Sequence, residues 1–293
     1  MRLHFTKMHG LGNDFILIDC REQTCPSESS DLRDFSRRLC DRRFGIGADQ
    51  ILLLHNSGKA DFRMQILNAD GSEVEMCGNG IRCLARYIWD RKLSEKNVLE
   101  IETLAGIIRP ERSLDMVKVD MGEPILEAEK IPVRLSQQSH PPHPSFSKGG
   151  VGMIIDYPLK IADREFMITC VSMGNPHAVI FVEDVAGFPV AHYGRLIETH
   201  SLFPKKTNVE FIQVMNRREI KMRVWERGAG ETTACGTGAS AAAVASALKG
   251  FTEKTVTVHL TGGDLLIERA ANNHIYMTGP AEQVFEGHVE MSL

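Results

Sequence analysis

Two glycine-rich stretches of the sequence decide the predicted fold. The first is NADGSEVEMCGNGIRCLARYIWDRK (68–92), and the second is ERGAGETTACGTGASAAAVASAL (226–248). In each stretch a cysteine, Cys77 or Cys235, stands directly before Gly-x-Gly, and a helical pattern follows. Apolar residues recur at helical spacing over 81–88, which predicts a helix with one buried stripe. The second segment is almost entirely small and apolar, which predicts a fully buried helix wrapped by sheet.

The two stretches belong to a longer repeat. Cys77 and Cys235 lie 158 positions apart, and other landmarks follow in the same order at nearly the same offset. These pairs are Asn13 with Asn175, Gln50 with Asn208, and Gly106 with Gly263. Coincidence among common Gly-Asn turns is the alternative, but ordered pairs at a near-constant offset favour an ancient duplication. A duplication predicts two similar domains with a small-ligand site in the cleft between them.

Short strand-like runs, separated by turns, dominate the rest of the chain. They cover 15–19, 50–54, 62–67, 98–104 and 116–122 in the first half, and 167–173, 177–182, 209–215, 221–226 and 255–262 in the second. Helical patterns cover 30–43 and the segments that begin at Asn79 and Thr237. Strands in adjacent runs predict an α/β protein with mixed, α+β-like sheets rather than a regular βαβ repeat. The proline-bearing segment 136–150 is predicted to be a surface loop, whose two histidines are not expected to bind a metal.

The composition excludes several classes of protein. The 293 residues are 43% hydrophobic and 25% charged, which is ordinary for a globular protein. The net charge of −4 and the lack of a Lys/Arg cluster with interleaved aromatic residues argue against nucleic acid as a partner. No apolar run approaches the roughly 18 residues that cross a bilayer, so no membrane association is expected. The N-terminal segment lacks the apolar core of a signal peptide, which predicts a cytoplasmic protein.

Seven cysteines are scattered along the chain, without a C-x-x-C pair and without the spacing of a zinc site or disulfide framework. In a reducing compartment most should be free thiols that pack in the core. This is the expectation for Cys20, Cys25, Cys40, Cys83 and Cys170. No metal site is predicted. Cys77 and Cys235 differ from these five because they share the Gly-x-Gly helix entry.

A thiol at a helix start has a particular chemistry. The first backbone N–H groups of a helix have no acceptor within it and favour an anion, here a thiolate or a carboxylate. A free thiol has a pKa of about 8.5, and a helix start is expected to lower this pKa by roughly one unit. If Cys77 and Cys235 share a cavity, ionising one disfavours ionising the other. The expected resting state is one thiolate and one thiol, which is what a two-base racemase needs.

Several polar residues at the ends of the strand-like runs fit a site for an amino acid, whose ammonium and carboxylate groups must both be held. They are Asn13, Asn68, Asn175 and Asn208, together with the adjacent Glu226 and Arg227. Each asparagine alone has a second explanation, because asparagine is common in turns. Glu226 and Arg227 also fit a solvated surface pair, but their position just before the Cys235 loop favours the site.

Together these motifs closely resemble one family, diaminopimelate epimerase. The motifs are MHGLGNDFILID (8–19), RRFGIGADQ (42–50), NADGSEVEMCGNGIRCLARY (68–87), VSMGNPHAV (171–179), TNVEF (207–211) and WERGAGETTACGTGASA (225–241). YMTGPAEQVFEG (276–287) extends the resemblance almost to the C-terminus. Six ordered motifs are far more specific than a single glycine-rich loop.

The resemblance implies an enzyme, an isomerase that interconverts LL- and meso-2,6-diaminopimelate without a cofactor, in lysine and peptidoglycan precursor biosynthesis. Cys77 and Cys235 would be the acid/base thiols, and His177 and Glu226 would assist near the reacting carbon. The substrate-binding residues would be Asn13, Gln50, Asn68, Gly78, Asn79, Asn175, Asn208, Glu226, Arg227, Gly236 and Thr237. Gly78, Asn79, Gly236 and Thr237 would offer the backbone N–H groups of the two helix starts.

The family fold implies two pseudo-symmetric domains, each with sheet wrapped around a central helix. The expected domains are 1–120 plus 279–293, carrying Cys77, and 121–278, carrying Cys235. A homodimer is also expected, although this chain has Phe285 where some members of the family carry a tyrosine at a dimer contact. The segment 136–150 looks longer than the usual connection in the family.

Three other functions compete with this interpretation. A related two-thiol racemase would act on proline, hydroxyproline or histidine, but the asparagine set and the Glu226-Arg227 pair suit a substrate with a second amino-acid head group. A thiol redox or peroxide sensor would also need reactive cysteines, but it does not explain the asparagines. A non-catalytic binding protein would need neither thiol.

Overall fold

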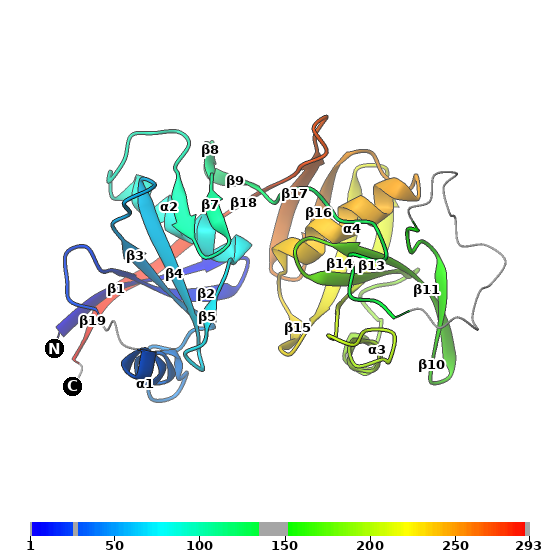
Figure 1. Ribbon diagram of the computed structural model, residues 1–293, viewed down its shortest axis with the longest axis horizontal. Helices are drawn as coiled ribbons and strands as arrows, with labels where there is room; N and C mark the ends of the chain where they lie inside the picture. Colours follow the sequence, from blue (N-terminus) through cyan, green and yellow to red (C-terminus); the bar gives the residue numbers. More distant parts are fainter. Residues whose placement is uncertain (1, 26–28, 135–151, 291–293) are drawn as a thin grey trace. The chain divides into compact units, whose positions relative to one another are not determined.

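The computed structural model describes residues 2–25, 29–134 and 152–290, so the predicted loop at 136–150 lies outside the described residues. The chain forms two compact units. The first comprises Met1–Asp120 and Thr278–Leu293, and the second comprises Met121–Met277. The second boundary therefore lies one residue before the expected position. Figure 1 shows that each unit contains a sheet and a central helix, which confirms the predicted α/β class.

The first unit is built on a mixed sheet with the strand order β19-β1-β2-β3-β4-β6-β7, in which β5 pairs with β4. The C-terminal strand β19 pairs antiparallel with β1, and Figure 1 shows the two ends of the chain side by side there. The strands are β1 (Arg2–Gly10), β2 (Asn13–Asp19), β3 (Gln50–His55), β4 (Phe62–Asn68), β5 (Glu73–Val74), β6 (Ile101–Thr103), β7 (Gly106–Ile108), β8 (Glu111–Ser113), β9 (Met116–Asp120) and β19 (Glu282–Glu290), and the helices are α1 (Ser29–Cys40) and α2 (Gly78–Asp90).

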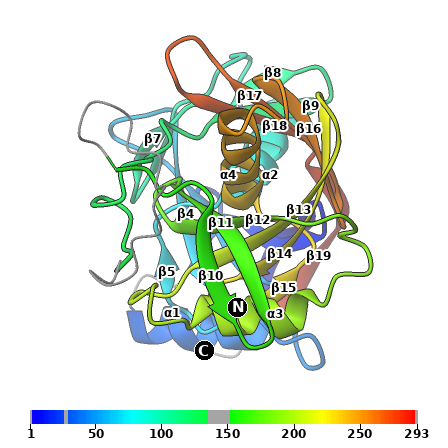
Figure 2. The same cartoon turned by 90° about the vertical axis from the view of Figure 1, so that its right-hand side faces the viewer.

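The second unit repeats this plan. From β10 onward, the strands of its sheet follow the order β10-β11-β12-β13-β14-β16-β17-β18, with β15 on β14. Figure 2 shows β10 and β11 as the neighbouring pair at one end of that sheet. The strands are β10 (Tyr157–Ile161), β11 (Arg164–Ser172), β12 (Pro176–Phe181), β13 (Asn208–Asn216), β14 (Glu219–Glu226), β15 (Gly230–Thr232), β16 (Thr255–Leu260), β17 (Gly263–Arg269) and β18 (Ile275–Gly279), and the helices are α3 (Val190–Glu198) and α4 (Gly236–Leu248).

The pairing register repeats along with the topology. β2 runs parallel to β3 with Phe15 opposite Gln50, and β12 runs parallel to β13 with His177 opposite Asn208. In both units the next pair is antiparallel, β3 with β4 and β13 with β14, and a parallel pair follows. The landmarks that suggested a duplication therefore occupy equivalent positions in two copies of one fold.

The central helix of each unit is buried because of its sequence. α4 consists almost wholly of alanine, glycine and serine with one valine, and these small side chains let strands β11 to β14, β16 and β17 pack around it. The hydroxyls of Ser240 and Ser246 donate to the carbonyls of Gly236 and Ala242, which satisfies them inside the core. α2 packs against β1, β2, β3, β4, β9 and β19 in the same manner.

The outer helix of each unit covers the other face of the sheet. In the first unit Phe35 and Leu39 of α1 pack in one core with Ile16 and Ile18 of β2, whereas Leu52 of β3 faces α2. Strands buried on both faces carry continuous apolar runs instead of alternation. This explains why runs such as FILID and QILLL were readable as strands.

The cysteine prediction is correct for three residues and wrong for two. Cys40, Cys83 and Cys170 are free and buried, and burial raises the pKa of each thiol to about 12, so they are inert packing residues. Cys20 and Cys25 instead form a disulfide, with their Cα atoms 5.7 Å apart.

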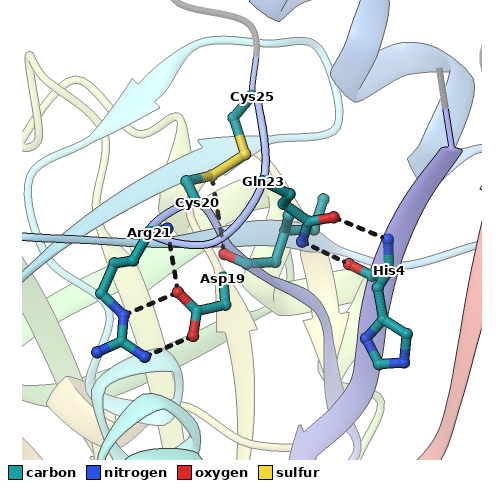
Figure 3. Close-up of a disulfide and its surroundings, with 7 residues drawn as sticks. His4, Asp19, Cys20, Arg21, Gln23 and Cys25 are labelled. Atoms are coloured by element: carbon teal, nitrogen blue, oxygen red, sulfur yellow. Dashed lines mark hydrogen bonds and ion pairs between the residues drawn. A yellow bond between two sulfur atoms is a disulfide. The ribbon is translucent and has the colours of Figure 1, made fainter.

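Local geometry explains the disulfide between Cys20 and Cys25. Figure 3 shows the turn after β2, where Arg21 donates to Asp19 and Gln23 exchanges hydrogen bonds with the backbone of His4. These bonds fold the segment back on itself and bring the two cysteines together. A spacing of five residues gives no hint of this, because it matches no common disulfide framework.

None of the helices among the described residues is long and apolar enough to cross a bilayer. Within those same ranges, no group of three or more His, Cys, Asp and Glu side chains is arranged to hold a metal ion.

Candidate active site: two half-sites built on helix starts

Each of the two singled-out cysteines is the N-cap of the central helix of its unit. Cys77 precedes α2 and Cys235 precedes α4, and both have extended backbone angles, with φ of −138° and −134°. The first intrahelical hydrogen bonds are Ile81 N to Cys77 O and Ala239 N to Cys235 O. The N–H groups that precede them have no acceptor within the helix, as predicted. We refer to the residues around Cys77 and around Cys235 as the Cys77 half-site and the Cys235 half-site.

A chain of amide hydrogen bonds organises the Cys77 half-site. Arg82 of α2, which is fully buried, donates to Asn79 Oδ1 over 3.0 Å. Asn79 donates to Asn13 Oδ1 over 3.1 Å, and Asn13 donates to Asp49 Oδ2 over 2.8 Å. Because Asp49 accepts and Arg82 donates, the chain fixes the orientation of both asparagine amides.

The Cys77 thiol lies beside Asn13, in the middle of this chain of hydrogen bonds. Its Sγ is 3.9 Å from Asn13 Oδ1 and accepts a hydrogen bond from Gly80 N over 3.4 Å. Cys77 is partly exposed. Asn13 itself follows a tight turn in which Leu11 and Gly12 have positive φ, so the turn carries the side chain to the start of β2 beside the helix.

Ion pairs support the Asp49 end of the chain. Arg42 bridges Asp14 and Asp49, and Lys7 also pairs with Asp14 over 2.7 Å. Burial opposes the ionisation of Asp14, but hydrogen bonds from Arg42 and Lys7 outweigh it and hold the pKa of that carboxyl well below its ordinary value. The Asp14 carboxylate, which Arg42 joins to Asp49, is thus held in its charged form.

The two other predicted residues of the first unit lie at adjacent strand ends. Gln50 Nε2 donates to Asn68 Oδ1 over 2.9 Å, and Asn68 Nδ2 donates to Ser72 Oγ over 2.9 Å. Gln50 begins β3 and Asn68 ends β4, directly opposite each other in the antiparallel register. Their amides form a polar pair at the end of the strands where Asn13 also lies.

The Cys235 half-site combines one asparagine amide with an imidazole and carboxyl groups. Cys235 Sγ is 3.5 Å from Thr237 Oγ1, and Asn175 Nδ2 donates to that hydroxyl over 3.3 Å. Asn175 Oδ1 is 2.9 Å from His177 Nε2, and His177 Nδ1 is 2.7 Å from Glu210 Oε1. Three predicted residues, Asn175, His177 and Thr237, therefore connect the thiol to a glutamate that the sequence did not single out.

Glu226 brings a second carboxyl to this thiol. It ends β14, and both Thr232 and Cys235 hydrogen-bond to its carboxylate. Burial raises the pKa of Glu226, against the effect of these hydrogen bonds and of His177. The surface-pair alternative is therefore wrong for Glu226, because its side chain lies beside the thiol.

Burial raises the pKa of Cys235 well above that of a free thiol, and Glu226 and Glu210 raise it further. Hydrogen bonds from Thr237 and from the Gly238 N–H act in the opposite direction but are smaller. The expectation that a helix start lowers the thiol pKa is thus wrong for Cys235. A helix start contributes about one unit, whereas full burial can shift a pKa by roughly 3–5 units.

Asn208 and Arg227 are joined through the backbone. Asn208 is buried, donates to Pro176 O over 2.9 Å and accepts from Arg227 N over 2.9 Å. It therefore ties the β12 start to the segment after β14. The Arg227 guanidinium donates to Lys205 O over 3.3 Å.

Glu198, at the end of α3, holds the segment after β14 in place, and the sequence did not predict this residue. Its carboxylate accepts from Trp225 Nε1 over 2.8 Å and from Gly228 N over 3.0 Å, and it pairs with Lys206. These two bonds flank Glu226 and Arg227 on both sides. A buried acid at the end of a short amphipathic helix was the available signal, but its partners are about 30 residues away in sequence.

The other residues that the sequence did not predict are Arg82, Asp49 and Glu210. Each of them hydrogen-bonds to a predicted site residue. Glu210 offered a sequence signal, since TNVEFIQV places one acid inside an otherwise apolar strand. Arg82 lies beside the apolar stripe of α2, where a charged residue is buried with the helix. For Asp49, no pattern in RRFGIGADQ distinguishes it from a surface residue.

Comparison with known proteins identifies relatives along almost the whole chain. The family model described as diaminopimelate epimerase matches residues 5–127 and 169–284. A Moorella thermoacetica protein named diaminopimelate epimerase is 54% identical over 292 residues, which cover 97% of this chain and 98% of the relative.

Solved structures with a similar fold are much more distant in sequence. A Bacillus anthracis phenazine biosynthesis protein of the PhzF family has a TM-score of 0.68 and 17% identity, with 99% of this chain and 100% of that chain covered. A hydroxyproline epimerase from Agrobacterium vitis, with bound trans-4-hydroxy-L-proline, has a TM-score of 0.66 and 14% identity, with 98% and 92% covered. At these identities the likeness concerns the fold alone.

Proposed function

Because the chain belongs to the diaminopimelate epimerase family, we propose that it interconverts LL- and meso-2,6-diaminopimelate by inverting one α-carbon between Cys77 and Cys235. As an epimerase it is an isomerase, and the reaction lies in lysine biosynthesis. The observation that carries the mechanism is the equivalent placement of two free cysteines, each as the N-cap of a buried central helix. A protein that only binds a ligand would not need this repeated arrangement of cysteines, and the fold itself does not require it.

Inversion proceeds by one proton transfer on each face of the carbon. A thiolate takes the α-proton, so a C–H bond breaks and an S–H bond forms. The other thiol gives its proton to the opposite face, so its S–H bond breaks and a new C–H bond forms. The turnover exchanges the two roles, and the reverse reaction uses the same groups. The two units must bring both cysteines to one substrate for this to occur.

The bound amino-acid group is held between the helix starts. The N–H groups of Gly78 and Asn79, and those of Gly236 and Thr237, offer positive helix ends to the reacting carboxylate, whose charge grows as the carbanion forms. Asn13 contacts the Cys77 thiol directly, and Asn175 reaches the Cys235 thiol through Thr237. His177 and Glu226 assist near the reacting carbon.

The second head group of the substrate is bound at the strand ends. Gln50 and Asn68 form one polar pair there, and Asn208 with Arg227 forms the other. The Arg227 guanidinium suits a carboxylate, because it can donate two parallel hydrogen bonds. A substrate with two amino-acid groups fills both sets, whereas proline would leave the strand-end groups unused.

Cys235 is the thiol that starts in its protonated form. This assignment rests on the high pKa of Cys235, which burial, Glu226 and Glu210 maintain. Cys77 is partly exposed and accepts the Gly80 N–H, which stabilises a negative sulfur. The isomer whose α-proton faces Cys77 therefore reacts without prior ionisation of the buried thiol.

The mechanism requires no cofactor, since every proton transfer is assigned to a side chain. The test uses protein freed of metals, pyridoxal phosphate and nucleotides by dialysis and gel filtration, with LL-diaminopimelate in D2O. We expect deuterium at one α-carbon and formation of the meso isomer, both seen by mass spectrometry and NMR. Proline, hydroxyproline and histidine serve as controls and should not exchange. If one of them exchanged and diaminopimelate did not, the substrate assignment would be wrong.

We also propose a homodimer formed through β19. This strand is the outermost strand of its sheet, and Val284 and Phe285 are 54% and 46% exposed. Phe285 packs edge-on against the buried Phe5 of β1, with ring centroids 5.9 Å apart, so its partly exposed ring is held in place on β19. Sedimentation should give twice the chain mass for the native protein and the chain mass for Phe285→Glu. A monomeric native protein would refute this.

A cytoplasmic location is part of the same proposal. Two cysteines act as acid and base only while they remain thiols, which a reducing compartment ensures. Cell fractionation of the producing organism, with blotting for the chain, tests the location. Recovery outside the cytoplasmic fraction would contradict it.

A further inference from the structure

A buried acid–imidazole pair lies beneath the start of α4. His177 and Glu210 are 1% and 0% exposed, and Nδ1 and Oε1 are 2.7 Å apart. A Cβ atom added to Gly238 would lie 2.8 Å from Glu210 Oε1, so this carboxyl contacts the first turn of the helix. Its other oxygen is buried without a hydrogen-bond partner among the described residues. Such a group costs free energy unless something compensates it.

The first unit shows that the fold does not require this pair. Phe15 lies opposite Gln50 in the first unit, as His177 lies opposite Asn208 in the second. Leu52 comes two residues after Gln50, and Glu210 comes two residues after Asn208. A Cβ atom on Gly80 would lie 3.0 Å from Leu52 Cδ2 and 3.5 Å from Phe15 Cε1. One helix start therefore packs on an apolar pair and the other on an ionisable pair. The difference points to a role in the Cys235 half-site rather than in folding.

The hydrogen-bond roles around His177 are constrained on both sides. Asn175 uses its Nδ2 to donate to Thr237, so its Oδ1 faces His177 and requires an N–H at Nε2. On the other side Nδ1 faces a carboxyl oxygen of Glu210. An imidazolium ring, with an N–H on both nitrogens, satisfies both oxygens at once, and the Glu210 carboxylate balances its charge.

We propose that Glu210 is a positioning residue that keeps His177 protonated on both ring nitrogens, which places a fixed positive charge beside the reacting carboxylate in the Cys235 half-site. The inference rests on the proposed function, since it assigns that charge to the α-carboxylate of the substrate. Glu210 does not touch the substrate and acts only through His177. The Cys77 half-site, with Phe15 in the equivalent position, has no such charge at that point.

The charge has two neighbours on which to act. As the carbanion forms, negative charge moves onto the α-carboxylate at the start of α4, where a buried cation stabilises it strongly. Glu226 of β14 is the second, because His177 opposes the rise in its pKa that burial causes. The remaining polar groups facing the ring, Asn175 and Thr237, are neutral, and Cys235 is the thiol that they connect to it.

The direct test is the protonation state of His177, measured in protein labelled with 15N-histidine. Long-range 1H–15N NMR distinguishes an imidazolium from either neutral tautomer, and the spectrum of His177→Asn assigns the signal. We expect an imidazolium in the native protein at neutral pH and a neutral ring with Nε2–H in Glu210→Gln. A neutral His177 in the native protein, or an imidazolium retained in Glu210→Gln, would overturn the inference. This readout needs no substrate, so it stands or fails separately from the proposed function.

Kinetics of the same variant supply the second arm. Glu210→Gln should lower kcat by about 10- to 100-fold with KM within about twofold, because a charge near the transition state is lost and binding contacts remain. Glu219→Gln, an exposed acid on the neighbouring strand β14, is the matched control and should behave as the native enzyme.

Glu210→Leu, which introduces the residue of the first unit, controls for folding. It should unfold cooperatively near the native temperature while losing at least as much kcat as Glu210→Gln. A native kcat in both Glu210 variants would refute the positioning role.

Discussion

The two half-sites share one backbone frame and differ in charge. In both, a cysteine caps a buried central helix, an asparagine begins or precedes the adjacent strand, and a residue of the helix start lies beside it. Around Cys77 the frame carries amides that end on a paired carboxylate, and the thiol is partly exposed. Around Cys235 it carries His177, Glu210 and Glu226, and the thiol is buried. A duplicated fold can thus supply symmetric geometry while side-chain replacements make one thiol the stronger acid.

The largest expected effect tests whether the halves act on opposite faces. Cys77→Ala and Cys235→Ala should each lower the rate of epimerisation by roughly 10³-fold or more, because an acid/base group contributes about 10²–10⁴-fold. Each variant retains one base and should still exchange the α-proton of one isomer without inverting it, and the two variants should prefer different isomers. Deuterium incorporation into LL- and meso-diaminopimelate, measured separately, checks this. The same preference in both variants would refute the opposite-face arrangement.

The next effect concerns the acidity of the two thiols. The pKa of Cys235 is raised, so this thiol stays neutral as the pH passes the ordinary value of about 8.5, and its thiolate appears only at higher pH. At neutral pH, iodoacetamide should therefore alkylate Cys235 in Cys77→Ala at least about tenfold more slowly than Cys77 in Cys235→Ala. Peptide mass spectrometry over a pH series measures both rates.

Removing a carboxylate beside Cys235 sharpens the same comparison. Adding Glu226→Gln to Cys77→Ala should move the alkylation of Cys235 to lower pH, because a negative charge that raises its pKa is lost. The fully buried Cys83 provides an internal control that should not react. Identical pH profiles for the two active-site thiols would mean that the half-sites do not differ in charge.

The two halves also orient their asparagines differently. Asn13 is fixed by Asp49, whereas Asn175 is fixed by His177, and the position equivalent to Asp49 holds the buried Thr207. Asp49→Ala should lower kcat/KM by about tenfold, since a hydrogen bond to a charged group is worth about 1.5–3 kcal/mol and part of the loss is recovered by water. Asp115→Ala, an exposed acid of the same unit, should leave kcat/KM unchanged. An equal loss in both would refute the role of Asp49.

The smallest expected effect concerns Glu198, the residue of the Cys235 unit that holds the segment carrying Arg227. Glu198→Gln weakens the two hydrogen bonds that flank Glu226 and Arg227, and also the ion pair with Lys206. We expect KM for diaminopimelate to rise about three- to tenfold with kcat within about twofold, because substrate binding loosens and the thiols are unaffected. Steady-state kinetics beside Glu165→Gln, an exposed acid of β11 in the same unit, measures the change. A fall in kcat without a change in KM would contradict this assignment.

Local patterns were enough to locate the helix starts and the strands. Gly-x-Gly before a helical pattern identified Cys77 and Cys235 as entries to α2 and α4, and the all-small composition of 236–248 predicted the buried helix. Repeated landmarks predicted the pseudo-symmetric fold, because equivalent turns recur at equivalent places in both copies. These features depend on residues that lie close together in the sequence.

Contacts between distant segments were not readable in the same way. Glu210 meets His177 from a neighbouring strand 33 residues away, and Glu198 meets Trp225 and Gly228 from a helix 27 and 30 residues away. The sign of the pKa shift at Cys235 was wrong for this reason. The helix start is a local feature, whereas burial and the carboxylates of Glu226 and Glu210 exist only after the sheet has closed around α4.

The sequence by itself determined that this chain forms two copies of one α/β unit, each with a cysteine at the start of its central helix, because helix entries, turns and apolar runs are local properties. Only the tertiary structure decided which thiol is buried among acids and which asparagines are held in one orientation. Charge and burial depend on distance in space, and that distance is set by the packing of segments far apart along the chain.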